Sequence, residues 1–255
     1  MDYQDTPIIV NSQIYNQSIK SYIDFIFINS IIQNKLWEEY LCNIICDFIE
    51  NDTDFLDIGA NIGLITLGVN KLLNNKKIKN IHCFECDNHI FSCLQYNTQN
   101  FENIKLYNFA VSHKFQLCNI TNNAYNRGSN MILKTHDNEK IENVIKHNAY
   151  EKYKTFHKYN NNIFYTSISL DEIMFTFLNK ISVIKIDVEG FEILVIKGAK
   201  NLIKKYKPVI VIEIQDKNFN ELNTLLLEYE YFLFKSFNYL IDGIKQENYI
   251  YLPNK

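Results

Sequence analysis

Apolar residues recur along this chain with two alternating spacings, which predict an alternation of strands and helices. The runs at 181–187 and 208–214 are almost continuously apolar, as in parallel strands that helices cover on both faces. The pattern therefore predicts an α/β fold around a mostly parallel sheet. Apolar residues at helical spacing predict helices at 30–50, 64–73, 88–100 and 219–230, and another helix that ends near 206. Further strands are expected at 54–58, 79–85, 104–111, 231–237 and 249–252.

The pattern weakens at 112–165, which is rich in Asn and contains the turn signal Asn126-Arg127-Gly128-Ser129. A weak pattern of this length inside a compact domain indicates an insertion or a lid, and such loops often carry substrate selectivity. Regular pattern returns near Thr166, with a helix expected to begin at Asp171. We therefore expect an N-terminal helical extension at 1–50, packed on a domain at 51–255 that contains this insertion.

The charge balance disfavours whole classes of partner. Formal net charge is −3 and the pI is near 6.1, so no global basic field attracts nucleic acid or anionic lipid. Residues 1–20 are polar and mixed, and no apolar run reaches 18 residues. These features predict a soluble, cytoplasmic protein without membrane insertion, and they leave a homodimer open. Glu38 and Glu39, beside Trp37 on the helix expected at 30–50, are interpreted as a solvated acidic face.

The six cysteines do not predict a disulfide framework. Cys83 and Cys86 form a C-x-x-C segment between His82 and His89. On a strand, Cys83 points to one face while His82 and Cys86 point to the other, so these side chains do not converge on a zinc ion. We interpret the cysteines as free thiols and assign no metal ligand, although the sequence leaves open whether a divalent cation assists.

The clearest candidate for a ligand site is the turn after the strand at 54–58. Gly59 and Gly63 connect this strand to the next helix, which brings backbone N–H groups to the sheet edge where α/β proteins bind ligands. The glycines are spaced G-x-x-x-G behind Asp57, with Asn61 between them, and not G-x-G-x-x-G as in dinucleotide-binding folds. A carboxylate there would repel a pyrophosphate, whereas it suits the cationic S-adenosylmethionine. An ordinary tight turn explains the glycines equally well.

Two later strand ends fit the same cofactor. Glu85 ends the second strand, where one carboxylate can accept hydrogen bonds from both hydroxyls of a ribose. Cys86 follows it directly. At the end of the third strand, Phe109 and Ala110 offer an aromatic edge and a backbone amide to an adenine, although core packing explains Phe109 equally well.

Acidic residues gather at the ends of the next two parallel strands. Asp187, Glu189 and Glu192 follow one strand and Glu213 ends its neighbour, on the edge that carries the glycine loop. If the donor is a sulfonium and the acceptor an alcohol, a carboxylate can take the proton that must leave. Asp187 is the first choice for this role and Glu189 the second, with Glu213 also a catalytic candidate. Glu189 and Glu192 are explained equally well as acidic residues that stabilise the positive N-terminal end of the following helix.

Together these segments resemble the FkbM family of S-adenosylmethionine-dependent methyltransferases over roughly 37–214. The segments are LDIGANIG, FEC, NFAVS, SLDEI, IKIDVEGFEILVIKGA and KPVIVIEI, in this order. The resemblance implies a class I methyltransferase (Rossmann-like) fold, with a seven-stranded, mostly parallel sheet whose last strand is antiparallel. It also implies O-methylation of hydroxyls on sugars or natural products.

The resemblance carries over residue by residue where the motifs match. It assigns the cofactor loop to Asp57, Gly59, Ala60, Asn61 and Gly63, and the ribose to Glu85. The acidic motif maps onto Asp187, Glu189, Gly190 and Glu192, of which Glu189 and Glu192, together with Ser129, are substrate-binding candidates. Cys86 departs from the family, which usually has proline after the acid.

Three other functions remain as alternatives. Methylation of a nucleobase is disfavoured because an N-P-P-[YF] motif is absent, and Asp187-Val188-Glu189-Gly190 stands in its position. A silent scaffold that keeps the fold is disfavoured by the intact glycine loop and Glu85. A dehydrogenase is disfavoured by the missing third glycine.

Overall fold

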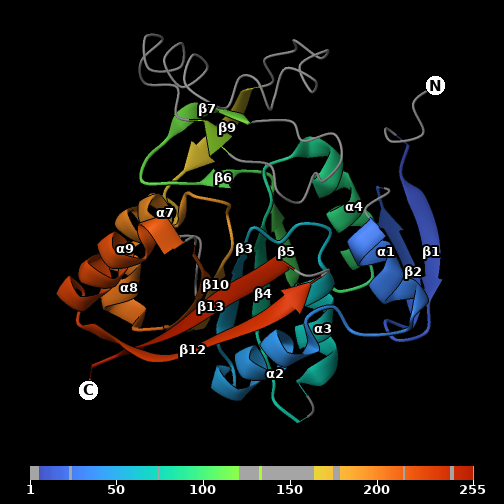
Figure 1. Ribbon diagram of the computed structural model, residues 1–255, viewed down its shortest axis with the longest axis horizontal. Coiled ribbons are helices and arrows are strands. Elements are labelled where there is room, and N and C mark those ends of the chain that lie inside the picture. The colour runs from blue at the N-terminus through green and yellow to red at the C-terminus, as the bar shows by residue number, and fades with distance from the viewer. Residues whose placement is uncertain are drawn as a thin grey trace.

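A central sheet of seven strands organises the computed structural model (Figure 1). The structure describes residues 6–22, 25–73, 75–120, 132–133, 164–174, 179–214, 216–241 and 244–254. The strand order is β12-β13-β11-β10-β3-β4-β5. The strands are β3 (Asp54–Ile58), β4 (Asn80–Phe84), β5 (Ile104–Tyr107), β10 (Ile181–Ile186), β11 (Val209–Glu213), β12 (Tyr231–Ile241) and β13 (Ile244–Pro253).

The strand directions confirm the predicted fold class. β3, β4, β5, β10 and β11 are parallel to one another, whereas β13 is antiparallel to both of its neighbours, β11 and β12. The last strand in the chain is therefore the antiparallel one, as the resemblance to the FkbM family implies. Parallel strands end at the same edge, so their carboxyl ends meet there.

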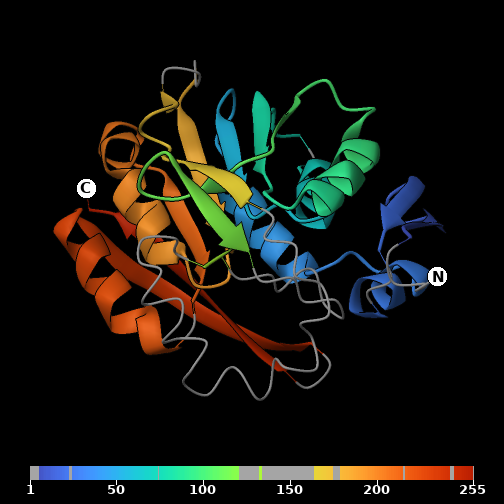
Figure 2. The same cartoon turned by 90° about the horizontal axis from the view of Figure 1, so that it is seen from above.

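Helices cover both faces of this sheet, as the hydrophobic pattern predicts (Figure 2). Phe55 and Val183 face the side of α2 (Glu39–Phe48), α3 (Leu64–Leu72) and α4 (Asn88–Thr98). Leu56 and Ile184 face the side of α7 (Glu192–Gly198), α8 (Lys200–Tyr206) and α9 (Asp216–Glu228). The alternation of buried residues along each strand thus produces two hydrophobic cores. Among the described residues, no helix is long and apolar enough to cross a bilayer.

The N-terminal residues contain a hairpin that the hydrophobic pattern did not predict. β1 (Ile8–Ser12) and β2 (Gln17–Ser21) pair antiparallel and precede α1 (Phe25–Ile32). Asn97 on α4 accepts a hydrogen bond from Lys20 N at 2.7 Å and donates one to Lys20 O at 3.0 Å. These contacts attach the hairpin to the domain through a residue far away in the sequence.

A second, smaller sheet lies over the carboxyl edge of the central one. It has the order β6-β9-β7-β8, formed by β6 (Ala110–Val111), β7 (Gln116–Ile120), β8 (Ile132–Leu133) and β9 (Phe164–Ile168). Its buried Ala110, Cys118 and Tyr165 pack with Phe191, next to Cys86 and Val188. The described part of 112–165 therefore covers the ends of β4 and β10.

Three elements differ from the predicted pattern. The strand expected at 104–111 divides into β5 and β6, because the Asn108 side chain donates to Glu85 O at 2.9 Å and Cys86 O at 3.2 Å and turns the chain. The helix ending at Tyr206 divides into α7 and α8. Asp171, where a helix was expected to begin, lies in a turn, and its carboxylate accepts the N–H groups of Asn201 and Leu202 in the first turn of α8.

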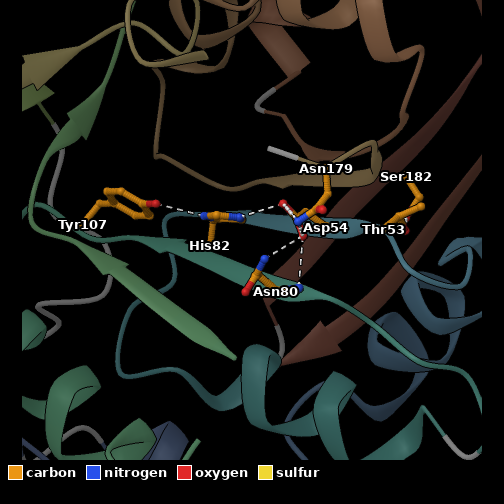
Figure 3. A network of polar contacts seen from close by, with 7 residues as sticks. All are labelled: Thr53, Asp54, Asn80, His82, Tyr107, Asn179 and Ser182. Atoms are coloured by element: carbon orange, nitrogen blue, oxygen red, sulfur yellow. Dashed lines mark hydrogen bonds and ion pairs between the residues drawn. The ribbon is translucent and has the colours of Figure 1, made fainter. Parts of the chain in front are cut away.

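A buried polar network links three neighbouring strands (Figure 3). His82 Nε2 lies 3.0 Å from Asp54 Oδ2, and His82 Nδ1 lies 3.0 Å from the Tyr107 hydroxyl. Asp54 Oδ1 also accepts hydrogen bonds from the Asn80 and Asn179 amides, each at 3.1 Å. Burial raises the pKa of Asp54, but the interaction with His82 and the amide hydrogen bonds outweigh it and hold the pKa below its ordinary value.

Candidate functional site

The glycine loop after β3 is in backbone contact with the end of β10. Gly59 has a φ of +79°, and a β-carbon there would come within 1.8 Å of the Asp187 carbonyl oxygen. Asp187 N in turn donates to Ile58 O at 3.0 Å. Only glycine fits a left-handed position with so close a neighbour. The two strand ends that the sequence assigned to cofactor and catalysis are therefore joined directly.

A buried lysine lies between the acidic residues of these two strand ends. Lys185 Nζ is 3.3 Å from Asp57 Oδ1 and 3.4 Å from Asp187 Oδ2, and it donates to Gly59 O at 3.0 Å. Thr66 Oγ1 donates to the other Asp57 oxygen at 2.6 Å. Burial lowers the pKa of Lys185, but the carboxylates of Asp57 and Asp187 outweigh burial and raise the pKa above its ordinary value. The lysine is therefore an ammonium.

Glu85 is oriented by two backbone donors at the end of β4. Its Oε1 accepts from Asp87 N at 2.8 Å and its Oε2 from Asn61 N at 3.1 Å. Burial raises the pKa of Glu85 to about 7, although these N–H groups lower it. Each carboxylate oxygen can accept a second hydrogen bond, so the group keeps capacity for a ligand hydroxyl.

A pocket opens at this edge between the glycine loop, the end of β4 and the small sheet. It brings together most of the predicted cofactor residues with two of the three predicted catalytic acids, Asp187 and Glu189. Asp57, Ala60, Gly63, Glu192 and Glu213 are not among its lining residues, and Ser129 lies outside the described residues. The pocket is lined by Ile58, Gly59, Asn61, Phe84, Glu85, Cys86, Asp87, Ile90, Phe109, Ala110, Val111, Asp187, Val188 and Glu189.

Three predicted residues that do not line the pocket, Ala60, Gly63 and Glu192, have structural roles in the segments next to it. Ala60 N donates to Phe84 O at 2.9 Å, which fixes the loop against β4. Gly63, with a φ of +90°, is the residue that precedes α3. Glu192 is only 2% exposed, its Oε1 accepts from Gly190 N at 2.7 Å, and its Oε2 has no hydrogen-bond partner in the described part of the chain.

Two acids near Asp187 hold protons unusually strongly. Burial, followed by the charges of Asp187 and Glu192, raises the pKa of Glu189 to about 7. Burial, followed by the charges of Asp187, Glu38 and Glu189, raises the pKa of Glu213 to about 9. Glu189 itself has a φ of +50°, an uncommon conformation for a residue with a side chain. A group with a pKa near 7 can accept or donate a proton at neutral pH.

The residues present fit S-adenosylmethionine in two respects. Beside the glycine loop, the buried Asp57 Oδ1 accepts no hydrogen bond from the described residues, although the Lys185 ammonium lies 3.3 Å away. The carboxylates of Asp57 and Asp187 against one Lys185 ammonium leave a net negative charge, which suits a cationic ligand. For a metal ion, the described residues offer no group of three or more His, Cys, Asp or Glu side chains in suitable positions.

Sequence reasoning missed two residues of this site. Lys185 is the single charge inside an otherwise apolar strand, and that exception could have identified it. Glu38 was interpreted as part of a solvated face, but it is half-buried, and its charge acts on both Lys185 and Glu213. No local pattern marks Glu38, because its position relative to β10 and β11 depends on how α2 packs.

Comparison with protein families identifies one matching domain. The model described as the Methyltransferase FkbM domain matches residues 57–241, which is more than half of the chain. No curated protein matches. The matched range contains Asp57, the glycine loop, Glu85 and the acids from Asp187 to Glu213, but not Glu38.

Solved structures with a similar fold include methyltransferases of several kinds. A crystal structure of methyltransferase FkbM from Methylobacillus flagellatus KT has a TM-score of 0.54 at 15% identity, covering 80% of this chain and 44% of that one. This chain therefore spans less than half the length of that relative. Precorrin-6y C5,15-methyltransferase from Geobacter metallireducens GS-15 has a TM-score of 0.47 at 12% identity, with 87% and 92% covered. M. capricolum TrmK in complex with S-adenosyl-homocysteine has a TM-score of 0.44 at 14% identity, with 85% and 69% covered.

Proposed function

Because this chain belongs to the FkbM family of methyltransferases, we propose that it transfers a methyl group from S-adenosylmethionine to a hydroxyl of a carbohydrate or glycoconjugate-type acceptor. The observation that carries this proposal is that Glu85 and Glu189 line one pocket. One of these acids suits a ribose and the other suits an acceptor proton. A two-substrate site requires this combination.

Residues on the cofactor side of the pocket would hold the donor by its different parts. Glu85, already oriented by two backbone N–H groups, would accept hydrogen bonds from the ribose hydroxyls. Cys86, Phe109 and Ala110 would contact the adenine, and the carboxylates of Asp57 and Asp187 would face the cationic methionine part. When bound, the cofactor supplies a methyl group on a positively charged sulfur.

The acidic residues divide the proton chemistry between them. Glu189, with a pKa of about 7, is the favoured general base for the acceptor hydroxyl, because its pKa matches neutral pH. Glu213, with a pKa of about 9, is protonated at neutral pH and can donate a hydrogen bond to the acceptor. Asp187, the first choice from sequence, forms an ion pair with Lys185, which favours an orienting role over that of the base.

The proposed acceptor class follows from the charge and hydrogen-bonding chemistry of the pocket. Carboxylates at the pocket suit hydroxyl-rich molecules, and a net charge of −3 disfavours nucleic acid. We further propose that the enzyme acts in the cytoplasm on a small-molecule or glycan acceptor.

The experiment that tests the proposal is transfer of labelled methyl from S-adenosylmethionine to a panel of mono- and oligosaccharides. We expect label on one class of sugar with the wild type and about 10²–10⁴-fold slower labelling with Glu189→Gln, which should still bind S-adenosylhomocysteine. Cofactor binding without label on any sugar would contradict the acceptor class. Absence of cofactor binding would contradict the methyltransferase function itself and favour a silent scaffold.

A further inference from the structure

We propose that Lys185 is a positioning residue of the cofactor site, which holds the glycine loop against the end of β10 by connecting Asp57, Gly59 and Asp187. It lies in the strand next to β3 and is paired in register with Asp57. Its side chain is 5% exposed, so the ammonium has exchanged water for these three oxygen partners. The inference rests on the proposed function, because the loop that Lys185 holds is the one assigned to the cofactor.

The contact with Gly59 is what makes the role specific to the loop. Lys185 Nζ donates to the Gly59 carbonyl at 3.0 Å, at the residue where a β-carbon would collide with Asp187. The hydrogen bond and the backbone contact therefore hold the same residue from two sides. Without the ammonium, the Gly59 carbonyl loses this donor, and the loop is released from one of the two constraints.

The charges around Lys185 explain why a lysine is tolerated in the core. Asp57 is fully buried and Asp187 is 37% exposed, and both lie within 3.4 Å of the ammonium. The negative charge of Glu38, the residue that precedes α2, also raises the pKa of Lys185. A buried charge is costly unless it is paired, so removal of the ammonium leaves Asp57 buried without its counter-charge. Loss of stability is therefore expected as well as loss of positioning.

A mutant cycle between Lys185 and Asp57 separates these two effects. Lys185→Met alone should lower the melting temperature, because Asp57 remains buried and uncompensated. Lys185→Met combined with Asp57→Asn removes both charges and should regain most of the lost stability. The double variant still lacks the donor to Gly59. It therefore provides a folded protein that differs from Asp57→Asn alone only by the Lys185→Met substitution, whatever happens to the single variant.

The readout is the dissociation constant of S-adenosylhomocysteine, measured by calorimetry well below the melting temperatures. We expect the double variant to bind at least tenfold more weakly than Asp57→Asn alone. Lys180→Met is the matched control, since Lys180 precedes the same strand but is exposed and, among the described residues, forms an ion pair only with Glu50, at 2.6 Å. It should change neither stability nor affinity by a measurable amount.

Two outcomes would overturn the inference in distinguishable ways. Equal affinity of the double variant and Asp57→Asn would mean that Lys185 contributes only to stability, and the positioning role would be refuted while the proposed function stands. A wild-type protein that does not bind S-adenosylhomocysteine would refute the proposed function and this inference together.

Discussion

Gly59 lies so close to Asp187 that a β-carbon at position 59 would come within 1.8 Å of the Asp187 carbonyl oxygen. Gly59→Ala should therefore force the loop away from β10 and disturb the cofactor pocket, which both residues line. Its positive φ adds strain for any side chain. We expect destabilisation by about 2 kcal/mol or more and loss of measurable S-adenosylhomocysteine binding. Urea unfolding and calorimetry check the two effects.

Gly198→Ala provides the matched control for this prediction. A β-carbon at Gly198 would come within 2.1 Å of the Ser112 carbonyl oxygen, but Gly198 ends α7 and does not line the pocket. This variant should lose stability and keep its affinity. If both variants lost affinity equally, the effect of Gly59→Ala would be a consequence of general destabilisation.

Glu189→Gln should lower turnover and leave cofactor affinity nearly intact, because its carboxylate is assigned to the acceptor proton. In the wild type, activity should rise with pH through about 7, as Glu189 loses its proton. Loss of a general base typically lowers the rate by about 10²–10⁴-fold. The measurement is the pH profile of kcat/KM. A Glu189→Gln variant with full activity and an unchanged profile would remove Glu189 from catalysis.

Glu213 should make the folded protein less stable at high pH. Its pKa is about 9 in the folded chain against an ordinary value of 4.5, so between these pH values the folded state binds more protons than the unfolded state. Stability therefore falls as pH rises through this window. Glu213→Gln removes the penalty and should raise the melting temperature at pH 8.5, by roughly 2–4 °C per kcal/mol relieved. At pH 5 the variant and the wild type should melt at similar temperatures, and an equal shift at both pH values would contradict the argument.

Asp54→Asn should destabilise the fold without directly touching the cofactor pocket. Asp54 is buried and is joined to His82, Asn80 and Asn179, and its pKa lies below the ordinary value (Figure 3). Breaking a buried pair of this kind costs about 3 kcal/mol or more. Because the pKa of Asp54 is depressed, its contribution is present above the unfolded pKa and is lost as pH falls. Urea unfolding at pH 7 and at a pH below 3.8, the ordinary pKa of an aspartate, should show a difference from wild type that shrinks at the lower pH.

Much of the fold could be predicted because its signals are local. The apolar runs of β10 and β11 and the glycine turn after β3 lie within short segments of sequence. The candidate acids Glu85 and Asp187 directly follow their strands and Glu213 ends its strand, and parallel strands bring their ends to one edge. The position of the pocket therefore follows from the strand pattern alone.

The missed features depend on contacts between distant segments. Lys185 has its role because β10 lies beside β3. This neighbourhood cannot be read from the order of the elements along the chain. The division of 104–111 depends on Asn108 reaching the end of β4, and the β1–β2 hairpin on Asn97 of α4. Each is a hydrogen bond between segments whose relative position is set by tertiary packing.

The measurement that tests the central claim most directly is calorimetric titration of S-adenosylhomocysteine into the wild type and Glu85→Ala, with Glu50→Ala as an exposed control. The account predicts micromolar binding by the wild type and the control. It predicts binding weaker by about 1–3 kcal/mol in Glu85→Ala, because a carboxylate held by Asn61 and Asp87 no longer meets the ribose. Equal affinity of all three proteins would contradict the assignment of Glu85, and no binding by any of them would contradict the account as a whole.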